Sequence, residues 1–312
     1  MIENSAPVSD RRVLVVGGNG FIGRHVVRAF LDAGAQVAIM DTAPAPAEFA
    51  ALDQVIGSVA DPTLMASAAS GAHIVVFLAN SSLPGSANSD LSSEVRAHVE
   101  TTVKAAEICA SLGVERFLFA SSGGTVYGYS SDTPLTEERH TAPKNAYGVS
   151  KLSIEHYLRI ITSLREMQCV ALRISNPYGE GQRAVRNQGF VAAAMQHAVR
   201  GQTLPIWGDG SVIRDFLHIS DVARAFVLAG AVPTPPEVVN IGSGQGVSLV
   251  QILDLIQAAL GRDIDIAFEP GRAIDVRKNV LDTTRARDLL GWHPQVDLAT
   301  GLQRTADWWL SL

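Results

Sequence analysis

The sequence has few cysteines and no long apolar run. Cys109 and Cys169 are its only two cysteines, and both lie in patterns typical of buried elements. They form neither a disulfide framework nor a metal-binding spacing, so we expect a cytoplasmic protein without a metal site. Residues 1–10 lack the apolar core of a signal peptide, and no apolar run reaches the roughly 18 residues that a membrane span needs.

Positive charge is scarce as well. The chain of 312 residues has 25 Lys and Arg against 31 Asp and Glu, for a net charge of −6. We therefore expect no general binding of nucleic acid or of anionic membranes. Residues 42–95 contain no Lys or Arg at all. In contrast, 47% of the residues are hydrophobic, which is enough for a large core, and the length suits about two domains.

Strand-like and helix-like patterns alternate through the first half of the chain. Residues 13–16 form a continuous apolar run, typical of a strand buried on both faces, and further strand-like runs occur at 36–40, 74–79, 117–120 and 170–174. Helical patterns separate them at 22–31, 62–70, 91–112 and 146–165. This alternation predicts an α/β fold with a doubly wound parallel sheet of the Rossmann type.

The alternation loosens after about residue 176, where glycine, proline and arginine become frequent. Helical patterns at 189–200 and 248–261 mix with strand-like segments. We therefore expect a second, smaller α/β domain that is interleaved with the first. The predicted division gives residues 1–178 and about 212–246 to the larger domain, and residues 179–211 and 247–312 to the smaller one.

A glycine-rich loop follows the first strand and opens the first helix. It reads Gly17-Gly18-Asn19-Gly20-Phe21-Ile22-Gly23, and the motif can begin at Gly17 or at Gly18. In either register one glycine permits the tight turn, one lets a pyrophosphate approach the backbone, and one allows close helix–strand packing. The N-terminus of the helix then offers unpaired N–H groups and a partial positive charge. The alternative is a glycine turn that binds nothing.

An acidic residue, Asp41, ends the second strand. In a dinucleotide site, a carboxylate at this place binds two ribose hydroxyls and repels a 2′-phosphate. Since residues 42–95 offer no Lys or Arg to hold such a phosphate, the sequence favours NAD over NADP as the cofactor.

Tyr147 and Lys151 lie four residues apart, on one face of a predicted helix. A tyrosine has a pKa near ~10, so it acts as a base at neutral pH only if that pKa falls by about three units. A nearby ammonium and a nicotinamide cation both favour the phenolate. The alternative is an exposed Tyr/Lys pair on the surface of a helix.

With these motifs in this order, the chain resembles the extended short-chain dehydrogenase/reductase family, in its NAD-dependent nucleotide-sugar epimerase/dehydratase branch, which includes the UDP-glucose 4-epimerases. The likeness runs from about Arg12 to Pro294. The resemblance rests on the motifs Gly17–Gly23, Val76–Ala79, Ser121–Gly128, Tyr147–Lys151, Arg173–Gly179, Gly208–Gly210, Arg214–His218 and Asn240–Gly244.

The resemblance implies roles for individual residues. Tyr147 would be the acid/base and Lys151 its electrostatic partner, and both would also contact NAD. The other cofactor-binding residues would be Gly17, Gly20, Phe21, Ile22, Gly23, Asp41, Ser58, Val59, Leu78 and Ala79. The nucleotide-sugar substrate would be bound by Asn176, Arg183, Gln188, Gly189, Phe190, Arg214, Arg272 and Asp275. Arginine suits a diphosphate because its planar fork donates two hydrogen bonds at once, although a single arginine could instead form a surface ion pair.

Two positions depart from the pattern of this family. Ser58 stands where the family often has an aspartate near the adenine. Counting back from Tyr127, the usual catalytic Ser or Thr falls on Gly123, which has no side chain. Thr125 is our first candidate to replace this hydroxyl, and Ser122 is the second.

The residues before Val126 restrict the reaction. Sugar 4,6-dehydratases of this branch have an Asp-Glu pair where this chain has Gly124 and Thr125, so dehydration is not expected. Gly123 and Gly124 would also leave room for the sugar. The resemblance then implies 4-epimerisation of a UDP-hexose or UDP-N-acetylhexosamine through a transient 4-keto sugar. The alternative is an NAD(P)H-dependent reductase of a 4-keto nucleotide sugar. A third hypothesis is a regulatory protein that binds a dinucleotide and catalyses no reaction.

The resemblance also implies a homodimer, formed by the helices predicted at 91–112 and 146–165. The apolar positions of these helices could equally face the sheet. Asn279 lies where related epimerases limit the sugar pocket, and its small size suits an N-acetylated sugar.

Overall fold

Seven parallel strands form the main sheet of the protein. The computed structural model describes residues 8–80, 87–129, 133–184, 189–271 and 276–312. The strand order is β10-β6-β5-β4-β1-β2-β3. The bounds are β1 Arg12–Val16, β2 Gln36–Asp41, β3 Asp53–Ile56, β4 Ile74–Phe77, β5 Arg116–Ser122, β6 Gln168–Ile174 and β10 Val238–Ile241. The sequence did not predict β3, which is short, lies at the sheet edge and has no fully buried residue.

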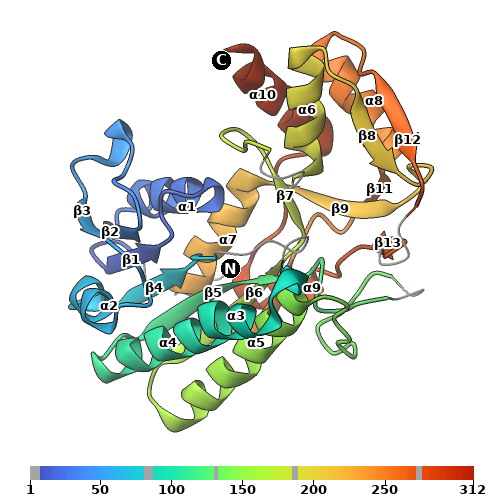
Figure 1. Ribbon diagram of the computed structural model, residues 1–312. Coiled ribbons are helices and arrows are strands. Elements are labelled where there is room, and N and C mark those ends of the chain that lie inside the picture. Colours follow the sequence, from blue (N-terminus) through green and yellow to red (C-terminus); the bar gives the residue numbers. More distant parts are fainter. Residues whose placement is uncertain (1–7, 81–86, 130–132, 185–188, 272–275) are drawn as a thin grey trace.

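Helices cover both faces of this sheet, as Figure 1 shows. Successive side chains of a strand point to opposite faces, so Val13 and Val15 lie in one core and Leu14 and Val16 in the other. The first core includes α1 (Phe21–Asp32), α7 (Ile219–Ala231) and α9 (Thr284–Leu290). The second includes α2 (Pro62–Ala69), α4 (Thr101–Ser111) and α5 (Ala146–Leu164). The prediction of a doubly wound Rossmann sheet is confirmed.

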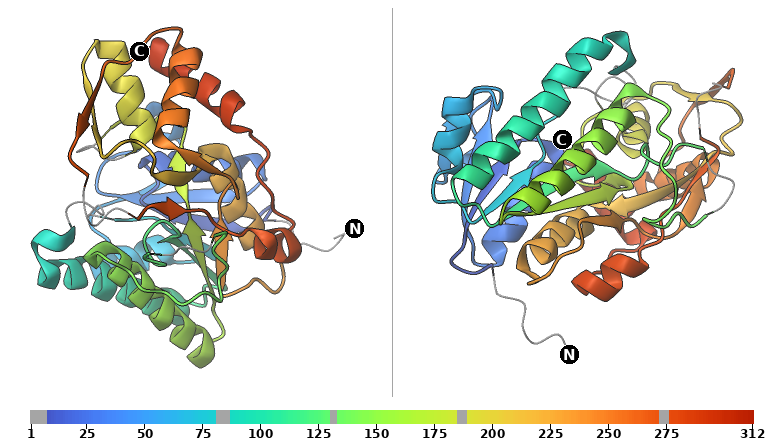
Figure 2. Two further views of the ribbon diagram at one scale, coloured as in Figure 1. Left: turned by 90° about the vertical axis from the view of Figure 1, so that its right-hand side faces the viewer. Right: turned by 90° about the horizontal axis from the view of Figure 1, so that it is seen from below.

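The helix predicted at 91–112 consists of three consecutive pieces. A short α3 (Leu91–Glu94) continues as a π-helical segment, Val95–Glu100, and then as α4. The view from below in Figure 2 shows this composite helix running beside α5 across the same face of the sheet.

A smaller part of the molecule is built from the later residues. A four-stranded mixed sheet joins β7 (Asn176–Tyr178), β9 (Ile213–His218), β11 (Gly246–Ser248) and β13 (Lys278–Asn279). A second, two-stranded sheet pairs β8 (Leu204–Trp207) with β12 (Ile266–Glu269). A third core gathers α6 (Phe190–Arg200), α8 (Leu249–Leu260) and α10 (Leu298–Leu310).

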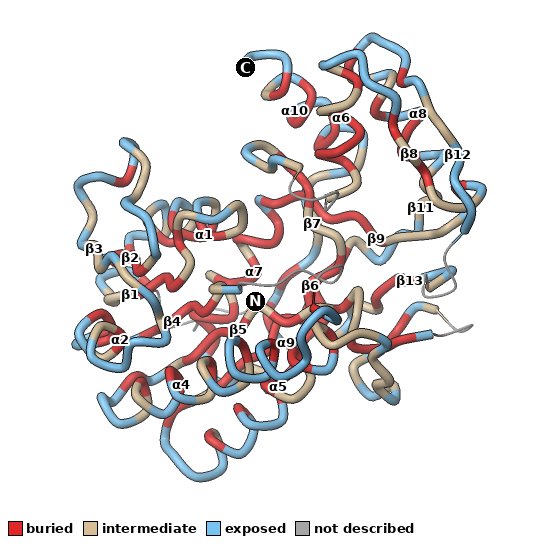
Figure 3. Tube along the Cα trace, in the orientation of Figure 1, coloured by how far each residue is buried: buried red, intermediate tan, exposed pale blue. Residues whose placement is uncertain are grey.

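The chain returns to the large sheet after entering the smaller part. Helix α7 and strand β10 pack with the first two hundred residues, which agrees with the interleaving that the sequence suggested. We propose the division given above, with residues 1–178 and about 212–246 as the NAD-binding domain and 179–211 and 247–312 as the nucleotide-sugar-binding domain. Figure 3 shows the buried strands of the large sheet between partly exposed helices.

Within the described ranges, no helix has both the length and the apolar character required to cross a membrane.

Candidate active site

The glycine loop between β1 and α1 forms a cradle that side chains would fill. Gly17 has a φ of +84°, and a Cβ there would lie 2.9 Å from the backbone nitrogen of Ala79. A Cβ on Gly23 would lie 2.7 Å from Cα of Gly18. Gly20 begins α1 without a side-chain cap, so the first N–H groups of the helix stay available for a phosphate. This cradle fits the pyrophosphate of a dinucleotide.

Asp41 supports the same loop from the end of β2. Its Oδ2 accepts a hydrogen bond from the backbone N–H of Asn19 at 2.9 Å, and its Oδ1 accepts one from Thr42 at 2.7 Å. Ser58 and Val59 follow β3, and the Oγ of Ser58 accepts a hydrogen bond from the N–H of Ala60 at 3.2 Å. These residues follow neighbouring parallel strands, where open α/β sheets bind dinucleotides.

A cavity of about 700 Å³ lies between the large sheet and the smaller part of the molecule. It brings together most of the residues that the sequence predicted for the site: Gly17, Gly20, Phe21, Ile22, Gly23, Leu78, Ser122, Thr125, Tyr147, Lys151, Asn176, Arg183, Gly189, Phe190 and Arg214. Four predicted cofactor residues lie outside its lining, namely Asp41, Ser58, Val59 and Ala79. Gln188, Arg272 and Asp275 lie outside the described residues.

Tyr147 and Lys151 are placed by the start of α5. The side chain of Asn145 caps the helix by accepting a hydrogen bond from the N–H of Gly148 at 2.8 Å. A Cβ on Gly148 would lie 2.9 Å from the carbonyl oxygen of Thr125, so glycine lets the helix approach the end of β5. This contact explains why a glycine directly follows the tyrosine.

Lys151 is buried beside the tyrosine. Its Nζ donates a hydrogen bond to the carbonyl of Ala120 at 2.9 Å and lies 5.4 Å from the ring centre of Tyr147. Burial lowers the pKa of Lys151 to about 8, although Glu94 and Glu155 act against this shift. Burial, with a smaller contribution from Glu94, raises the pKa of Tyr147 well above its usual range. Without a bound cofactor, Tyr147 therefore keeps its proton at neutral pH.

The hydroxyls near Gly123 have different surroundings. The Oγ1 of Thr125 is buried and has no hydrogen-bond partner among the described residues. Thr125 and Ser122 both line the cavity. A Cβ on Gly123 would lie 2.6 Å from Cδ1 of Leu281 and 3.0 Å from the carbonyl of Arg173. Packing thus requires a glycine at 123, whereas Gly124 lines the cavity and leaves it open.

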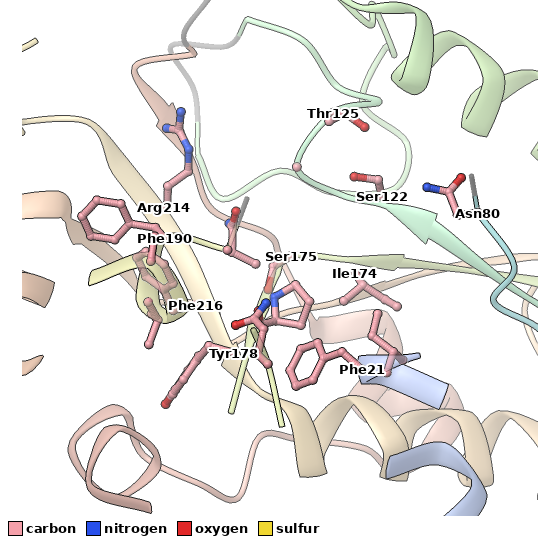
Figure 4. A pocket seen from close by; sticks show the side chains of 18 of the residues that line it. Phe21, Asn80, Ser122, Thr125, Ile174, Ser175, Tyr178, Phe190, Arg214 and Phe216 are labelled. Atoms are coloured by element: carbon pink, nitrogen blue, oxygen red, sulfur yellow. The ribbon is translucent and has the colours of Figure 1, made fainter. Parts of the chain in front are cut away.

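The opposite wall comes from the smaller part of the molecule. Figure 4 shows Arg214, Phe190 and Phe216 across the cavity from Ser122 and Thr125. The guanidinium of Arg214 donates hydrogen bonds to the carbonyls of Ile213 at 2.9 Å and Val276 at 2.6 Å, which fix its direction.

Nearby, the side-chain amide of Asn176 donates to the carbonyl of Asp215 at 2.9 Å, and Asn176 lines the cavity. Arg214 and Asn176 are thereby held at this wall of the cavity by the backbone around them.

Sequence reasoning missed several polar residues of the cavity, and two of them, Asn80 and Ser175, follow parallel strands. Asn80 follows β4, and Ser175 stands between β6 and β7; both line the cavity and are labelled in Figure 4. The Oγ of Ser175 is buried and has no hydrogen-bond partner within the described ranges. The available signal was position, because a polar residue directly after a parallel strand lies at the ligand-binding edge of the sheet.

Asn279 does not appear in the cavity lining. Its side chain is 1% exposed, and its amide donates a hydrogen bond to the carbonyl of Gly123 at 3.0 Å. Asn279 therefore stabilises the turn at Gly123 through this hydrogen bond. The suggestion that the size of Asn279 limits the sugar pocket stays a prediction.

Known proteins are similar to this chain in sequence and in fold. Residues 13–242 match the family model described as the NAD dependent epimerase/dehydratase family. The chain is 33% identical over 306 residues to a UDP-glucose 4-epimerase from Mycolicibacterium smegmatis, covering 95% of this chain and 97% of that protein. It is 30% identical over 302 residues to a dTDP-4-dehydro-6-deoxyglucose reductase from Escherichia coli, covering 94% and 95%.

A solved structure gives the same result for the fold. The UDP-glucose 4-epimerase of Thermotoga maritima with UDP-glucose aligns with a TM-score of 0.90 and 30% identity, covering 96% of this chain and 99% of that one. The resemblance to nucleotide-sugar epimerases is confirmed at the level of the family. Because the family match covers well over half of the sequence, this chain belongs to the NAD dependent epimerase/dehydratase family and uses NAD as its cofactor.

Proposed function

We propose that the protein is an NAD-dependent 4-epimerase of a nucleotide sugar, either a UDP-hexose or a UDP-N-acetylhexosamine. The observation that carries the proposal is the pairing of Tyr147 and Lys151 at one wall of the cavity with Arg214 at the other. Gly124 and Thr125 provide no carboxylate for dehydration. The relatives named above include UDP-glucose 4-epimerases, which supports the same activity.

The residues of this chain have distinct tasks in the proposed reaction. The chemistry that NAD supplies when bound is acceptance of a hydride from C4 and its return to the opposite face of the 4-keto sugar. Tyr147 takes the proton of the 4-hydroxyl and later gives it back. The ammonium of Lys151 and the positive charge of the oxidised cofactor lower the pKa of the tyrosine from its raised value.

Other residues orient the substrate. Thr125, with its unpartnered Oγ1, hydrogen-bonds the 4-oxygen, and Ser122 is the second candidate. Arg214 and Asn176 bind the pyrophosphate, since both line the substrate wall. The roles of Gln188, Arg272 and Asp275 stay predictions.

Product analysis tests the proposal directly. Purified protein is incubated with a panel of UDP- and dTDP-linked hexoses and N-acetylhexosamines, without added cofactor. We expect the C4 epimer of at least one sugar, and Tyr147→Phe should abolish its formation. The absence of any epimer across the panel would reject the proposed activity.

A reductase of 4-keto nucleotide sugars is the second candidate. It is favoured by the 30% identity to the reductase from Escherichia coli, and it would use the same Tyr147 and Lys151. A reductase consumes NADH or NADPH in proportion to product, whereas the epimerase regenerates its bound NAD in each cycle. Stoichiometric oxidation of added reduced cofactor with a 4-keto sugar would therefore identify the reductase.

We further propose a homodimer formed by the composite helix and α5 of each protomer. Both helices carry apolar side chains that are exposed in the single chain: Leu91, Val95, Leu112, Val149, Tyr157, Ile160 and Leu164. The outer faces of α4 and α5 are partly pale in Figure 3. Two adjacent helices per protomer can form a four-helix interface around a twofold axis.

The dimer is tested by sedimentation equilibrium of two matched variants. Ile160→Glu places a charge at the proposed interface and should give a monomer. Leu289→Glu, on α9 and about equally exposed, is the control and should stay dimeric. A wild-type monomer at micromolar concentration would contradict the proposal.

We also propose a reducing compartment, the cytoplasm. Cys109 and Cys169 are buried free thiols, and burial raises their pKa values to about 12 and about 11. Recovery of the protein in a membrane or secreted fraction of its source cells would contradict this proposal.

A further inference from the structure

Two titratable residues occupy the buried side of an otherwise exposed helical stretch. In Leu91–Glu100 only Glu94 and His98 are buried, and each is 5% exposed. Such positions normally hold apolar residues, because burying a charged group costs free energy that packing alone does not return. Packing therefore does not explain an acid and an imidazole at these two positions.

The two side chains lie against each other across the start of the π-helical segment. Oε2 of Glu94 is 3.6 Å from Nε2 of His98. Oε1 of Glu94 is buried and has no hydrogen-bond partner among the described residues. π-helical turns occur frequently at functional sites. Oε2 of Glu94 thus lies beside the imidazole but beyond hydrogen-bond distance, and Oε1 has no hydrogen-bond partner among the described residues.

The stretch packs on α5, which carries Tyr147 and Lys151. Lys151 has a second carboxylate nearby, Glu155, but the guanidinium of Arg173 already binds Glu155, with NH2 to Oε2 at 2.7 Å. Glu94 has no such arginine in the described part of the chain. Its charge is therefore the one that is available to Lys151.

The charge of Glu94 acts on the pKa values of three neighbours, Tyr147, Lys151 and His98. Burial is the largest cause of the pKa shift at each of these residues. Glu94 raises the pKa of Tyr147 and opposes the lowering of the pKa of Lys151. Burial lowers the pKa of His98; Glu94 opposes this shift and Lys151 adds to it. The other charged residues of the stretch, Arg96 and Glu100, are exposed.

We propose that Glu94 is a positioning residue for the acid–base step, whose buried carboxylate holds Lys151 in its ammonium form at neutral pH. The imidazole of His98 lies beside this carboxylate. The inference rests on the proposed function, since it takes Tyr147 and Lys151 as the acid–base pair. In the resting enzyme Glu94 keeps both protons in place, and the ammonium it maintains is the group that later stabilises the Tyr147 phenolate.

Without the negative charge of Glu94, both Lys151 and Tyr147 bind their protons less tightly. Both macroscopic pKa values of the pair must then fall, whichever residue titrates first. For a buried carboxylate on a segment that packs against α5 we expect a shift of about one pH unit toward acid. A role in folding alone would change stability without moving the titration.

The main test follows the phenolate absorbance of Tyr147 during a pH titration of the NAD-loaded protein. The signal is isolated by subtracting the same titration of a matched Tyr147→Phe protein. Glu94→Gln, which keeps the shape and removes the charge, should move the midpoint to lower pH by about one unit. Glu100→Gln, on the exposed side of the same segment, should leave the midpoint at the wild-type pH. A midpoint that is the same in Glu94→Gln and in wild type overturns the inference.

Glu94→Leu is the second variant, because it removes the same charge and fills the buried position with an apolar side chain of similar size. It should show the same acid shift, and an unshifted midpoint in it overturns the inference as well. The titration needs no sugar. A shifted midpoint without any epimerised or reduced sugar would reject the proposed function alone, whereas turnover with an unshifted midpoint would reject the role of Glu94 alone.

Discussion

Glu155 on α5 binds the guanidinium of Arg173 on β6 with both carboxylate oxygens. Nε of Arg173 donates at 3.1 and 3.2 Å, and NH2 donates at 2.7 Å. The hydroxyl of Ser121 also donates to Glu155, and NH1 of Arg173 donates to the hydroxyl of Tyr127 at 2.9 Å. All four side chains are buried. The network therefore fixes the end of β5 relative to the helix that carries Tyr147 and Lys151.

Glu155→Gln should destabilise the protein strongly, because Arg173 would remain as a buried cation without its counter-charge. Breaking a buried pair in this way costs about 3–5 kcal/mol. Urea denaturation measures the loss. Glu237→Gln is the control, since it breaks the exposed pair with Arg159 and should stay within about 1 kcal/mol of wild type. Equal stability of the two variants would show that the buried pair is not needed for the fold.

The rate should decline at alkaline pH through the loss of a proton from Lys151. Its pKa is lowered to about 8 by burial, and the neutral amine no longer stabilises the phenolate of Tyr147. The pH profile of kcat/KM reports the free enzyme, so its alkaline limb should have a midpoint of about 8. Lys151→Met should be much slower and lack this limb. A wild-type limb at the ordinary pKa of lysine would contradict the assignment.

The lowered pKa of Lys151 also affects the stability of the fold. The rate should fall as the pH rises, whereas the free energy of unfolding should increase. The pKa of Lys151 in the folded protein lies below the ordinary lysine value of 10.5, so the unfolded chain binds more protons between about pH 8 and that value. The free energy of unfolding therefore gains a contribution that rises with pH across this window. Wild type and Lys151→Met compared by urea denaturation at both ends of the window measure this contribution.

Local motifs predicted the fold, and most of the residues proposed for the site line one cavity. The glycine loop, Asp41 and the Tyr147–Lys151 spacing depend on contacts within one or two neighbouring elements, and those elements have clear periodic patterns. The edge strand β3 was missed because its four residues carry no buried apolar run.

Other features depend on contacts between distant segments, which a single sequence does not reveal. Gly123 is required by Leu281, which belongs to the last quarter of the chain. Glu94 and His98 were overlooked because the helical pattern at 91–112 gave no sign that its buried side would hold titratable groups. The roles of Gly123, Glu94 and His98 depend on how deeply each residue is buried and on which residues it contacts. Both properties are known only from the three-dimensional structure.

Gly123→Ser should destabilise the protein without restoring a catalytic hydroxyl. A Cβ there would lie 2.6 Å from Leu281 and 3.0 Å from the carbonyl of Arg173, and overpacking of this kind costs about 1–3 kcal/mol. Gly124→Ser is the control, since the nearest atom to a Cβ there, Oγ of Ser122, is 3.9 Å away. The free energies of unfolding are compared in urea. A Gly123→Ser protein with wild-type stability and a higher rate would reverse this interpretation.

Thr125→Val should separate stability from catalysis. The Oγ1 of Thr125 is buried without a hydrogen-bond partner among the described residues, and such a group costs about 1–3 kcal/mol in the folded protein. Valine keeps the shape and removes that cost, so the melting temperature should stay equal or rise. The rate should fall because the 4-oxygen loses a hydrogen bond in the transition state. One such bond corresponds to a loss in kcat of roughly 10- to 100-fold.

Three controls decide which hydroxyl acts. Thr125→Ser keeps the hydroxyl and should retain most of the rate. Ser122→Ala and Ser175→Ala each remove another hydroxyl of the cavity and should have the smaller effect. If Thr125→Val and Ser122→Ala both keep the wild-type rate while Ser175→Ala does not, the partner of Tyr147 comes from the end of β6, because that strand lies beside β5 in the sheet.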